Sequence, residues 1–401
     1  MFKNRIFVAV ISGHFVVDVL NSMGAVLLAV LREPLGLSYA QIGTALTIYL
    51  LIGSLSQPLF GWLSDKLVGR RMLLAGISVA WMALFYTLVS LAPSWTWLLP
   101  VFLLAPLGSG LFHPIGTAVA GTAVPERAAS ATSIFFFFGQ AGLAIGPFLA
   151  GALAGSFGSV GLIPLTLLAL LPAGMLIAAM RAEGRLVAQQ KSVARVAVTV
   201  PWAGPATAVI VAFIVLVALR SSIQSIYQSY LPQLFQGRGW DPALFGLLAG
   251  VFMGAGAAGQ MINGTMADRY GLRAAIIWPL LLSVPAGMLC IFAPSVWGAF
   301  IGCAAAGLLI GGQHSVLVVY AQQLLPVKQG FAAGLILGFT FASGAIGTWL
   351  AGQSADSMGL ATVMQWATLG ALPCVLLALS LPGRVRPVIA EAQVAQPSSA
   401  D

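Results

Sequence analysis

The chain has 401 residues, of which 59% are apolar and only 7% are charged, and its mean hydropathy is +0.98. Soluble globular domains carry roughly 25% charged residues, so this composition excludes a soluble protein. Apolar runs long enough to cross a bilayer core of about 30 Å recur from Ile6 to Leu381. They predict an all-α membrane protein. The net charge of +8 then reflects orientation in the membrane and gives no support to nucleic-acid binding.

The apolar runs predict twelve transmembrane helices in two sets of six. The first run follows Lys3 and Arg5 and continues beyond Leu28, which is too long for the apolar part of a signal peptide. The helices of the first set are expected at 5–31, 39–64, 71–92, 96–123, 129–155 and 159–181. Those of the second set are expected at 205–235, 243–267, 273–293, 296–324, 330–355 and 359–381.

The lysines and arginines predict how these helices are oriented, because cytoplasmic loops carry an excess of basic residues. With the N-terminus inside, only Arg32 and Arg238 fall in outer loops, and Arg220 alone falls within a span. We therefore expect a multi-pass protein of the bacterial inner membrane with both ends in the cytoplasm. The other fifteen of the 18 basic residues fall in cytoplasmic segments: Lys3, Arg5, Lys66, Arg70, Arg71, Arg127, Arg181, Arg185, Lys191, Arg195, Arg269, Arg273, Lys328, Arg384 and Arg386.

A polar stretch at 181–199, RAEGRLVAQQKSVARVAVT, interrupts the apolar pattern midway along the chain. It predicts a cytoplasmic linker at 182–204, part of which can form an amphipathic helix at the membrane surface. The linker separates an N-terminal six-helix half at 1–181 from a C-terminal six-helix half at 205–383. A short cytoplasmic tail is expected at 384–401.

The two sets of helices contain an internal repeat with an offset of about 200 positions. The sequence GWLSDKLVGRR at 61–71 returns as GTMADRYGLR at 264–273. Three coincidences in one register favour a duplicated six-helix unit, as transporter halves commonly show. The matched residues are Asp65 with Asp268, Gly146 with Gly347, and His113 with His314.

The repeated loop motif resembles the signature of the major facilitator superfamily between helices two and three. Its glycine permits close helix contact, and its acid and bases can form a charge network that breaks and reforms as the halves rock. The alternative is a basic cytoplasmic loop with an incidental aspartate, and the first copy has one extra residue before Gly69. The residues assigned to gating and packing are Gly61, Asp65, Arg70 and Arg71 in the first copy and Gly264, Asp268, Arg269 and Arg273 in the second.

A second motif lies in the fifth predicted helix, where GLAIGP contains Gly142, Gly146 and Pro147. It resembles the glycine–proline motif of antiporter-type facilitators. Small residues at this spacing permit tight helix contact, and a proline kinks the helix. The alternative is plain helix packing, which produces the same pattern.

Four segments together resemble the fosmidomycin resistance protein family. They are HFVVDVLNS at 14–22, GSGLFHPIGTA at 108–118, SIFFFFGQAGLAIGP at 133–147 and VVYAQQLLP at 318–326. The resemblance spans most of the chain and implies a facilitator fold and proton-driven export that confers drug resistance. In that family an acid often follows the His-Pro pair, whereas here the position is Ile115.

Ionisable residues within membrane spans are functional candidates because burying them is costly. Asp18 is the single acid placed well inside a span, and His14 and Asn21 share its helix face. Arg220 is the single permanent cation inside a span. We hypothesise that Asp18 is the proton-coupling carboxylate and that Arg220 either neutralises it or binds an anionic substrate group. The alternative is a static ion pair that holds the halves together.

His113 and His314 are candidate cavity residues from equivalent helices, with roles in proton coupling or substrate contact. The alternative is a histidine that only hydrogen-bonds between helices. Three histidines without cysteine partners or closely spaced carboxylates make a poor metal site, so neither a metal nor another cofactor is expected. The residues that could orient a substrate by hydrogen bonding are Gln140, Gln224, Tyr227 and Gln313.

These observations predict a secondary active transporter that works by alternating access, in which protons are the coupling ion. Efflux of a drug or a phosphonate-like organic anion by antiport is the first expectation. The alternatives are proton-coupled uptake of a small metabolite such as an organic acid or sugar, and a membrane receptor that has lost transport. An enzyme is not expected, because the sequence contains no phosphate-binding Walker loop and no catalytic triad. The expected partners are a small-molecule substrate and the lipid bilayer, with the protein as a monomer.

Overall fold

The computed structural model describes residues 2–67, 69–124, 127–189, 207–324 and 329–382, and these are nearly all helical. The first group of helices is α1 Arg5–Arg32, α2 Tyr39–Lys66, α3 Arg71–Ser90, α4 Trp95–Leu104, α5 Pro106–Ala123, α6 Ala128–Phe157, η2 Ser159–Leu162, α7 Ile163–Leu168 and α8 Leu170–Gln189. The second group is α9 Thr207–Gln236, α10 Pro242–Tyr270, α11 Leu272–Phe292, α12 Val296–Ala306, η3 Gly307–Gly311, α13 His314–Leu324, α14 Gln329–Met358, α15 Leu360–Leu369 and α16 Ala371–Ser380.

The membrane spans agree closely with the prediction. Within the described residues, eleven helical segments are long and apolar enough to cross a membrane. α14 is the twelfth long helix, and it lies beside α2 and α9. The twelve-helix, all-α prediction is therefore confirmed. Of the predicted linker, α8 continues as far as Gln189, whereas the rest of the linker and the tail at 384–401 lie outside the described residues.

Four of the twelve spans are interrupted, which the apolar pattern did not predict. In the fourth span α4 ends at Leu104, because Pro106 begins α5 and a proline has no backbone N–H to continue the preceding helix. In the tenth span the five residues of η3 form a π-helix between α12 and α13. A π-helix is a single turn with one residue more than an α-helical turn and is common at functional sites. The sixth and twelfth spans break after Leu168 and Leu369.

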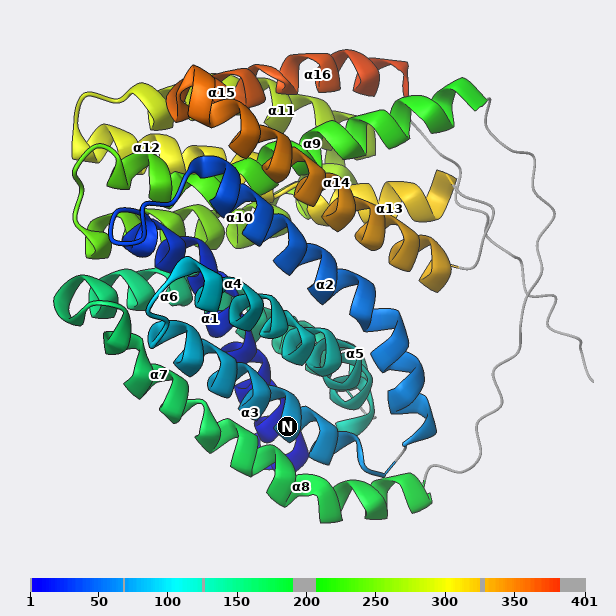
Figure 1. Ribbon diagram of the computed structural model, residues 1–401. Coiled ribbons are helices and arrows are strands. Elements are labelled where there is room, and N and C mark those ends of the chain that lie inside the picture. The colour runs from blue at the N-terminus through cyan, green and yellow to red at the C-terminus, as the bar shows by residue number, and fades with distance from the viewer. Residues whose placement is uncertain (1, 68, 125–126, 190–206, 325–328, 383–401) are drawn as a thin grey trace, which may run out of the picture.

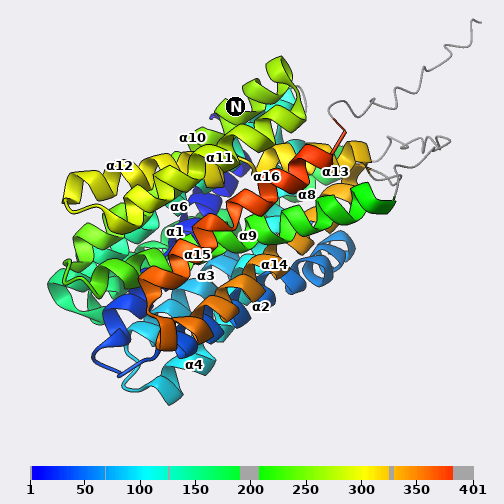
Figure 2. The same cartoon turned by 90° about the horizontal axis from the view of Figure 1, so that it is seen from above.

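The two groups of helices lie on opposite sides of the molecule (Figure 1), and the view from above shows the central position of α1 and α9 (Figure 2). Within the first group α1 packs on α6, where Gly142 and Gly146 bring the backbones together. A Cβ at Gly142 would overlap the Phe15 carbonyl, and one at Gly146 would overlap Ser22. The glycines of the fifth-span motif therefore allow close packing of α1 on α6, which both interpretations of the motif expect.

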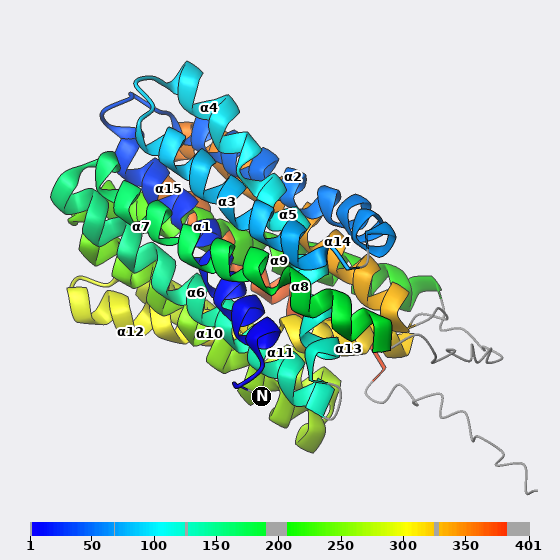
Figure 3. The ribbon, with the colours of Figure 1, turned by 90° about the horizontal axis from the view of Figure 1, so that it is seen from below.

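The two groups contact each other through the ends of the helices that the charge pattern places outside. α2 crosses α14 there, and α6 crosses α10. At the first crossing Gly43 lies against Gly352, and the Thr47 hydroxyl donates to the Ala345 carbonyl at 2.8 Å. At the second crossing Gly246 lies against the carbonyl of Pro147. The view from below shows α6 beside α10 (Figure 3). The side of the molecule that the charge pattern places outside, called the outer side, is thus closed.

An aspartate from the second group caps a helix of the first group at this closed side. The two carboxylate oxygens of Asp356, near the end of α14, accept from the backbone N–H groups of Tyr39 at 2.9 Å and Ala40 at 3.0 Å. These N–H groups begin α2 and have no partner within their own helix. Nearby, the Gln233 amide of α9 donates to the Ala25 carbonyl of α1 at 3.0 Å. Polar contacts to backbone groups therefore join the halves outside.

Candidate functional site

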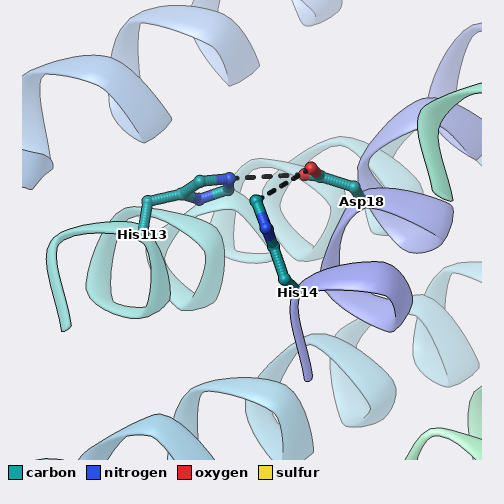
Figure 4. Close-up of side chains that lie close together, drawn as sticks. All are labelled: His14, Asp18 and His113. Carbon is teal, nitrogen blue, oxygen red and sulfur yellow. Dashed lines mark ion pairs between the residues drawn. The ribbon is translucent and has the colours of Figure 1, made fainter. Parts of the chain in front are cut away.

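Asp18, His14 and His113 form a cluster inside the first group of helices (Figure 4). His14 and Asp18 are four residues apart on one face of α1, and His113 reaches them from α5. Nε2 of His14 lies 3.2 Å from Oδ2 of Asp18, and Nε2 of His113 lies 3.4 Å from Oδ1. The carboxylate therefore stands between two imidazoles, and each oxygen faces a different ring.

The ring of His14 is fixed from its other side by α6. Its Nδ1 lies 2.7 Å from the carbonyl oxygen of Phe135, and the Phe135 ring stacks on the imidazole with centroids 3.8 Å apart. Gly139 lies one turn further along α6, where a Cβ would overlap both the His14 ring and Oδ2 of Asp18. His14 is 2% exposed. It is consequently locked in place by its surroundings.

His113 is oriented in the same way but is more accessible. Its Nδ1 lies 2.9 Å from the carbonyl oxygen of Ser109 and 3.2 Å from the Ser109 hydroxyl. Its side chain is 25% exposed, against 3% for His14 and 8% for Asp18. His113 is therefore the most exposed member of the cluster.

A chain of neutral polar groups extends from Asp18 to α2 and α3. The Asn21 amide donates to Asp18 Oδ1 at 3.1 Å and to the Ser109 hydroxyl at 2.8 Å. Tyr49 of α2 donates to Asn21 Oδ1 at 3.0 Å, and its hydroxyl also lies 3.0 Å from that of Tyr86 on α3. Asn21 was predicted from the sequence, whereas its partners Ser109, Tyr49 and Tyr86 were not. The one signal for Ser109 was its position four residues before His113, on the same helix face.

The cluster also has the ligand types of a metal site, although no metal was expected from three histidines without cysteine partners or closely spaced carboxylates. One atom from each of the three residues lies within 4.8 Å of the others. However, each nitrogen already lies at a hydrogen-bonding distance from its own oxygen of Asp18. These two contacts hold the three residues together as one buried centre.

Arg220 does not pair with Asp18, contrary to the ion pair considered from the sequence. Its side chain is fully buried within the second group, where Nη2 donates to the carbonyls of Ile310 and Gly311 in the π-helix η3. The two charged groups thus lie in separate halves, each held by its own helices. Nε and Nη1 of Arg220 have no hydrogen-bond partner among the described residues.

The remaining candidates for substrate contact lie on α6, on α9 and in the tenth span. Gln313 is fully buried, and its amide donates to the Ile276 carbonyl at 3.3 Å, while His314 begins α13 and is half-buried. His314 therefore does not join His113, although the two positions match in the repeat. Tyr227 is buried with its hydroxyl 2.6 Å from that of Thr368. Gln140 and Gln224 are half-buried on α6 and α9.

The loop motifs of the repeat differ in the structure. In the first copy Arg71 Nη2 and Asp65 Oδ1 form an ion pair at 2.8 Å, and Arg70 is the residue before α3. In the second copy the Arg269 guanidinium lies over the ring of Tyr270 at 5.3 Å, and Arg273 lies in the first turn of α11. Asp268 is near the end of α10.

Close helix contact at both motif glycines was expected, and for Gly264 this is wrong. A Cβ at Gly61 would make an ordinary contact with Pro114, whereas one at Gly264 would meet nothing within 4 Å. Among the described residues, only Gly61 of the two motif glycines thus has such a neighbour, and its contact with Pro114 is an ordinary one.

A small cavity lies where the two groups meet, between α1, α6, α9 and α10. It has a volume of about 10 Å³, which is room for about one water molecule. Ser22 of α1 lines it, and its hydroxyl donates to the Asp18 carbonyl at 2.9 Å. Tyr227 and Gln228 of α9 line the opposite side. The centre formed by His14, Asp18 and His113 is thus one helical turn from the boundary between the halves.

Comparison with known proteins gives the family. The chain matches the family model of the Major Facilitator Superfamily over residues 10–233 and 213–399. It is 30% identical over 363 residues to the fosmidomycin resistance protein of Escherichia coli (strain K12), covering 88% of this chain and 87% of that protein. It is 29% identical over 369 residues to the uncharacterised transporter YfnC of Bacillus subtilis (strain 168), covering 88% and 86%.

Solved transporter structures share the fold at low sequence identity. A D-xylose–proton symporter superposes with a TM-score of 0.70 at 12% identity, covering 96% of this chain and 99% of that one. A bacterial homologue of the human lysosomal transporter Spinster, in an inward-facing and unoccupied conformation, superposes with a TM-score of 0.68 at 16% identity, covering 93% and 96%. The predicted facilitator fold and the predicted family resemblance are both confirmed, and the chain belongs to the Major Facilitator Superfamily.

Proposed function

We propose that this multi-pass transporter couples the movement of protons to the efflux of a drug or small organic anion by antiport. The observation that carries the proposal is the buried carboxylate of Asp18 between two imidazoles. Ionisable groups at this depth mark ion pathways in membrane transporters. The relative named for fosmidomycin resistance supports efflux as the direction and a phosphonate as the first substrate to test.

The position of the centre on α1 supports coupling between proton binding and alternating access. α1 contributes Asp18 to the centre and, two turns further on, the Ala25 carbonyl that accepts from Gln233 of α9. A change of charge at Asp18 therefore acts on the same helix that closes the outer side. In facilitators, alternating access is largely a rocking of one half against the other. In the inward-facing conformation, release of the protons to the cytoplasm would leave the transporter ready to bind the next substrate molecule.

The first test is replacement of Asp18 by Asn in proteoliposomes with an imposed pH gradient. The probes are fosmidomycin, a carboxylate, a sugar and a lipophilic cation. We expect the wild-type protein to move one of them against its gradient, and Asp18→Asn to lose gradient-driven transport by at least tenfold, because an amide binds no proton at neutral pH. Asp241→Asn is the matched control, since Asp241 only caps α10 in an exposed turn.

The outcomes of this test separate the candidate functions. Full coupling in Asp18→Asn contradicts a proton-coupling role for that carboxylate. Movement of substrate and protons in the same direction replaces antiport by uptake symport. Absence of flux for every probe in folded wild-type protein favours a receptor that has kept the fold.

A further inference from the structure

The hydrogen bonds on the far side of each imidazole determine where the protons of the centre lie. Nδ1 of His14 faces the Phe135 carbonyl, and Nδ1 of His113 faces the Ser109 carbonyl. A carbonyl oxygen can only accept, so each Nδ1 carries a hydrogen. At His113 the Ser109 hydroxyl oxygen, 3.2 Å from the same nitrogen, is then a second acceptor. The tautomers follow from these acceptors. A neutral His14 or His113 therefore has a bare Nε2.

A bare Nε2 is incompatible with the contact that each ring makes on its other side. Nε2 of His14 and Nε2 of His113 each point at an oxygen of Asp18, at 3.2 and 3.4 Å. A nitrogen lone pair facing a carboxylate lone pair at this distance is repulsive, and in a buried setting the repulsion is weakly screened. Each contact becomes attractive only when a proton lies within it.

We infer that the centre holds two exchangeable protons in this conformation, one in the contact of Asp18 with His14 and one in the contact with His113. Two contacts need two protons, and one carboxyl group can supply only one of them. An imidazole nitrogen is ordinarily more basic than a carboxylate, so both protons are placed on Nε2. The loaded centre then carries two imidazolium ions and one carboxylate, a net charge of +1. The empty centre carries −1.

No neighbouring group that the structure describes adds a charge to the centre, so its charge changes only with these two protons. α2 and α3 contribute Tyr49 and Tyr86, which reach Asp18 only through the neutral amide of Asn21. α6 contributes Phe135 and Gly139, which carry no titratable side chain. Among the described residues, no lysine, arginine or further acid forms an ion pair with the three members of the centre.

The two protons differ in their access to water. The His113 side chain is 25% exposed, whereas that of His14 is 3% exposed and is covered by the Phe135 and Phe112 rings. We place the entrance for both protons on the side of His113, because its ring is the more exposed of the two.

Nuclear magnetic resonance of protein labelled with ¹⁵N only at histidine tests this inference without a substrate. The chain contains three histidines, and His113→Gln and His314→Gln assign the signals by their loss. We expect His14 and His113 to show two protonated nitrogens each at low pH. At high pH both should show a bare Nε2 and a protonated Nδ1, which is the less common tautomer of free histidine. His314 is the internal reference, because it lies outside the centre.

Two results would overturn the inference: a bare Nδ1 on either ring, or an Nε2 that stays bare at the lowest pH at which the protein is folded. The inference rests on the proposed function only for its role in transport. If the vesicle assay shows no coupling while both rings titrate as described, the proposed function fails and the two-proton centre stands.

Discussion

Arg220 is a permanent positive charge placed inside a helix bundle. Its guanidinium donates to two carbonyls of the π-helix η3, and its other nitrogens have no partner among the described residues. Burial of such a charge is costly unless the surroundings hold it firmly. The contacts of Arg220 favour a role in holding η3 in place over a role in binding Asp18.

Replacing Arg220 by Lys should therefore destabilise the protein. Lysine keeps the charge but lacks the planar fork that reaches two carbonyls, so we expect a loss of about 1–3 kcal/mol, seen as a lower Tm in detergent. Arg238→Lys is the matched control, because Arg238 also donates to a backbone carbonyl, that of Ile291, but in a more exposed turn. Its Tm should change less. An unchanged Tm with lost transport would instead indicate that Arg220 contacts the substrate.

At the scale of residues, the sequence predicted the part of the site that lies on one helix. The spacing of His14, Asp18 and Asn21 places them on one face of α1, and the structure agrees. It could not show that His113, and not its repeat partner His314, completes the site. That choice depends on how α5 packs against α1, where the rings of Phe112 and His14 stack with centroids 6.0 Å apart.

The crossing of α2 and α14 is the element that fastens the outer side. The crossing is close because Gly43 and Gly352 have no side chains, and Tyr230 of α9 places its hydroxyl beside both, where it donates to the Thr348 carbonyl at 3.1 Å. Asp356 then caps α2 from the opposite half. Any opening of the outer side must give up these contacts together.

Replacing Asp356 by Ala should shift the protein towards an outer-open conformation. A lost helix cap costs about 1 kcal/mol, which corresponds to roughly a fivefold change in the ratio of the two conformations. The measurement is the distance between spin labels on cysteines introduced at Pro34 and Met358, two exposed positions on the two halves. Asp241→Ala is the control, because Asp241 caps α10 within its own half. An equal shift in both variants would argue against the role of Asp356 in holding the outer side closed.

At the scale of elements, the sequence predicted which segments are helices but not where the helices break. The spans that contain Pro106 and Leu369 are continuous apolar runs in the sequence. Hydropathy does not depend on backbone hydrogen bonding, so it gives no sign of these breaks. Only the proline gave a local signal, and prolines such as Pro58 and Pro147 lie inside unbroken helices. Neighbouring helices decide which prolines interrupt a span.

For the whole molecule, the charge pattern predicts that both ends of the chain lie in the cytoplasm, and the fold alone does not give this orientation. A fluorescent protein fused after Asp401 should fluoresce, because it remains in the cytoplasm, and alkaline phosphatase inserted between Gly237 and Arg238 should be active, because it is exported. An active phosphatase fused after Asp401 would reverse the orientation. The measurement is the activity of both reporters in intact cells, with phosphatase fused after Arg71 as the inactive control.

The overall architecture was predictable because the bilayer imposes it. Helices of about 20 apolar residues, basic inner loops and a repeat of six spans follow from the sequence without knowledge of any contact. The conformation did not follow, because the same helices can meet at either end. It is decided by contacts such as that of Asp356 with α2, which join residues more than 300 positions apart.

The π-helix η3 has a geometric consequence for everything that follows it. An ordinary α-helix turns by roughly 100° for each residue, and a π-turn accommodates one residue more than an α-turn does. If Gly307–Gly311 tightened into α-helix, α13 would rotate by about that angle about its own axis, starting with His314. The guanidinium of Arg220 holds the wider turn. One side chain of α9, that of Arg220, thus determines which face α13 turns towards its neighbours.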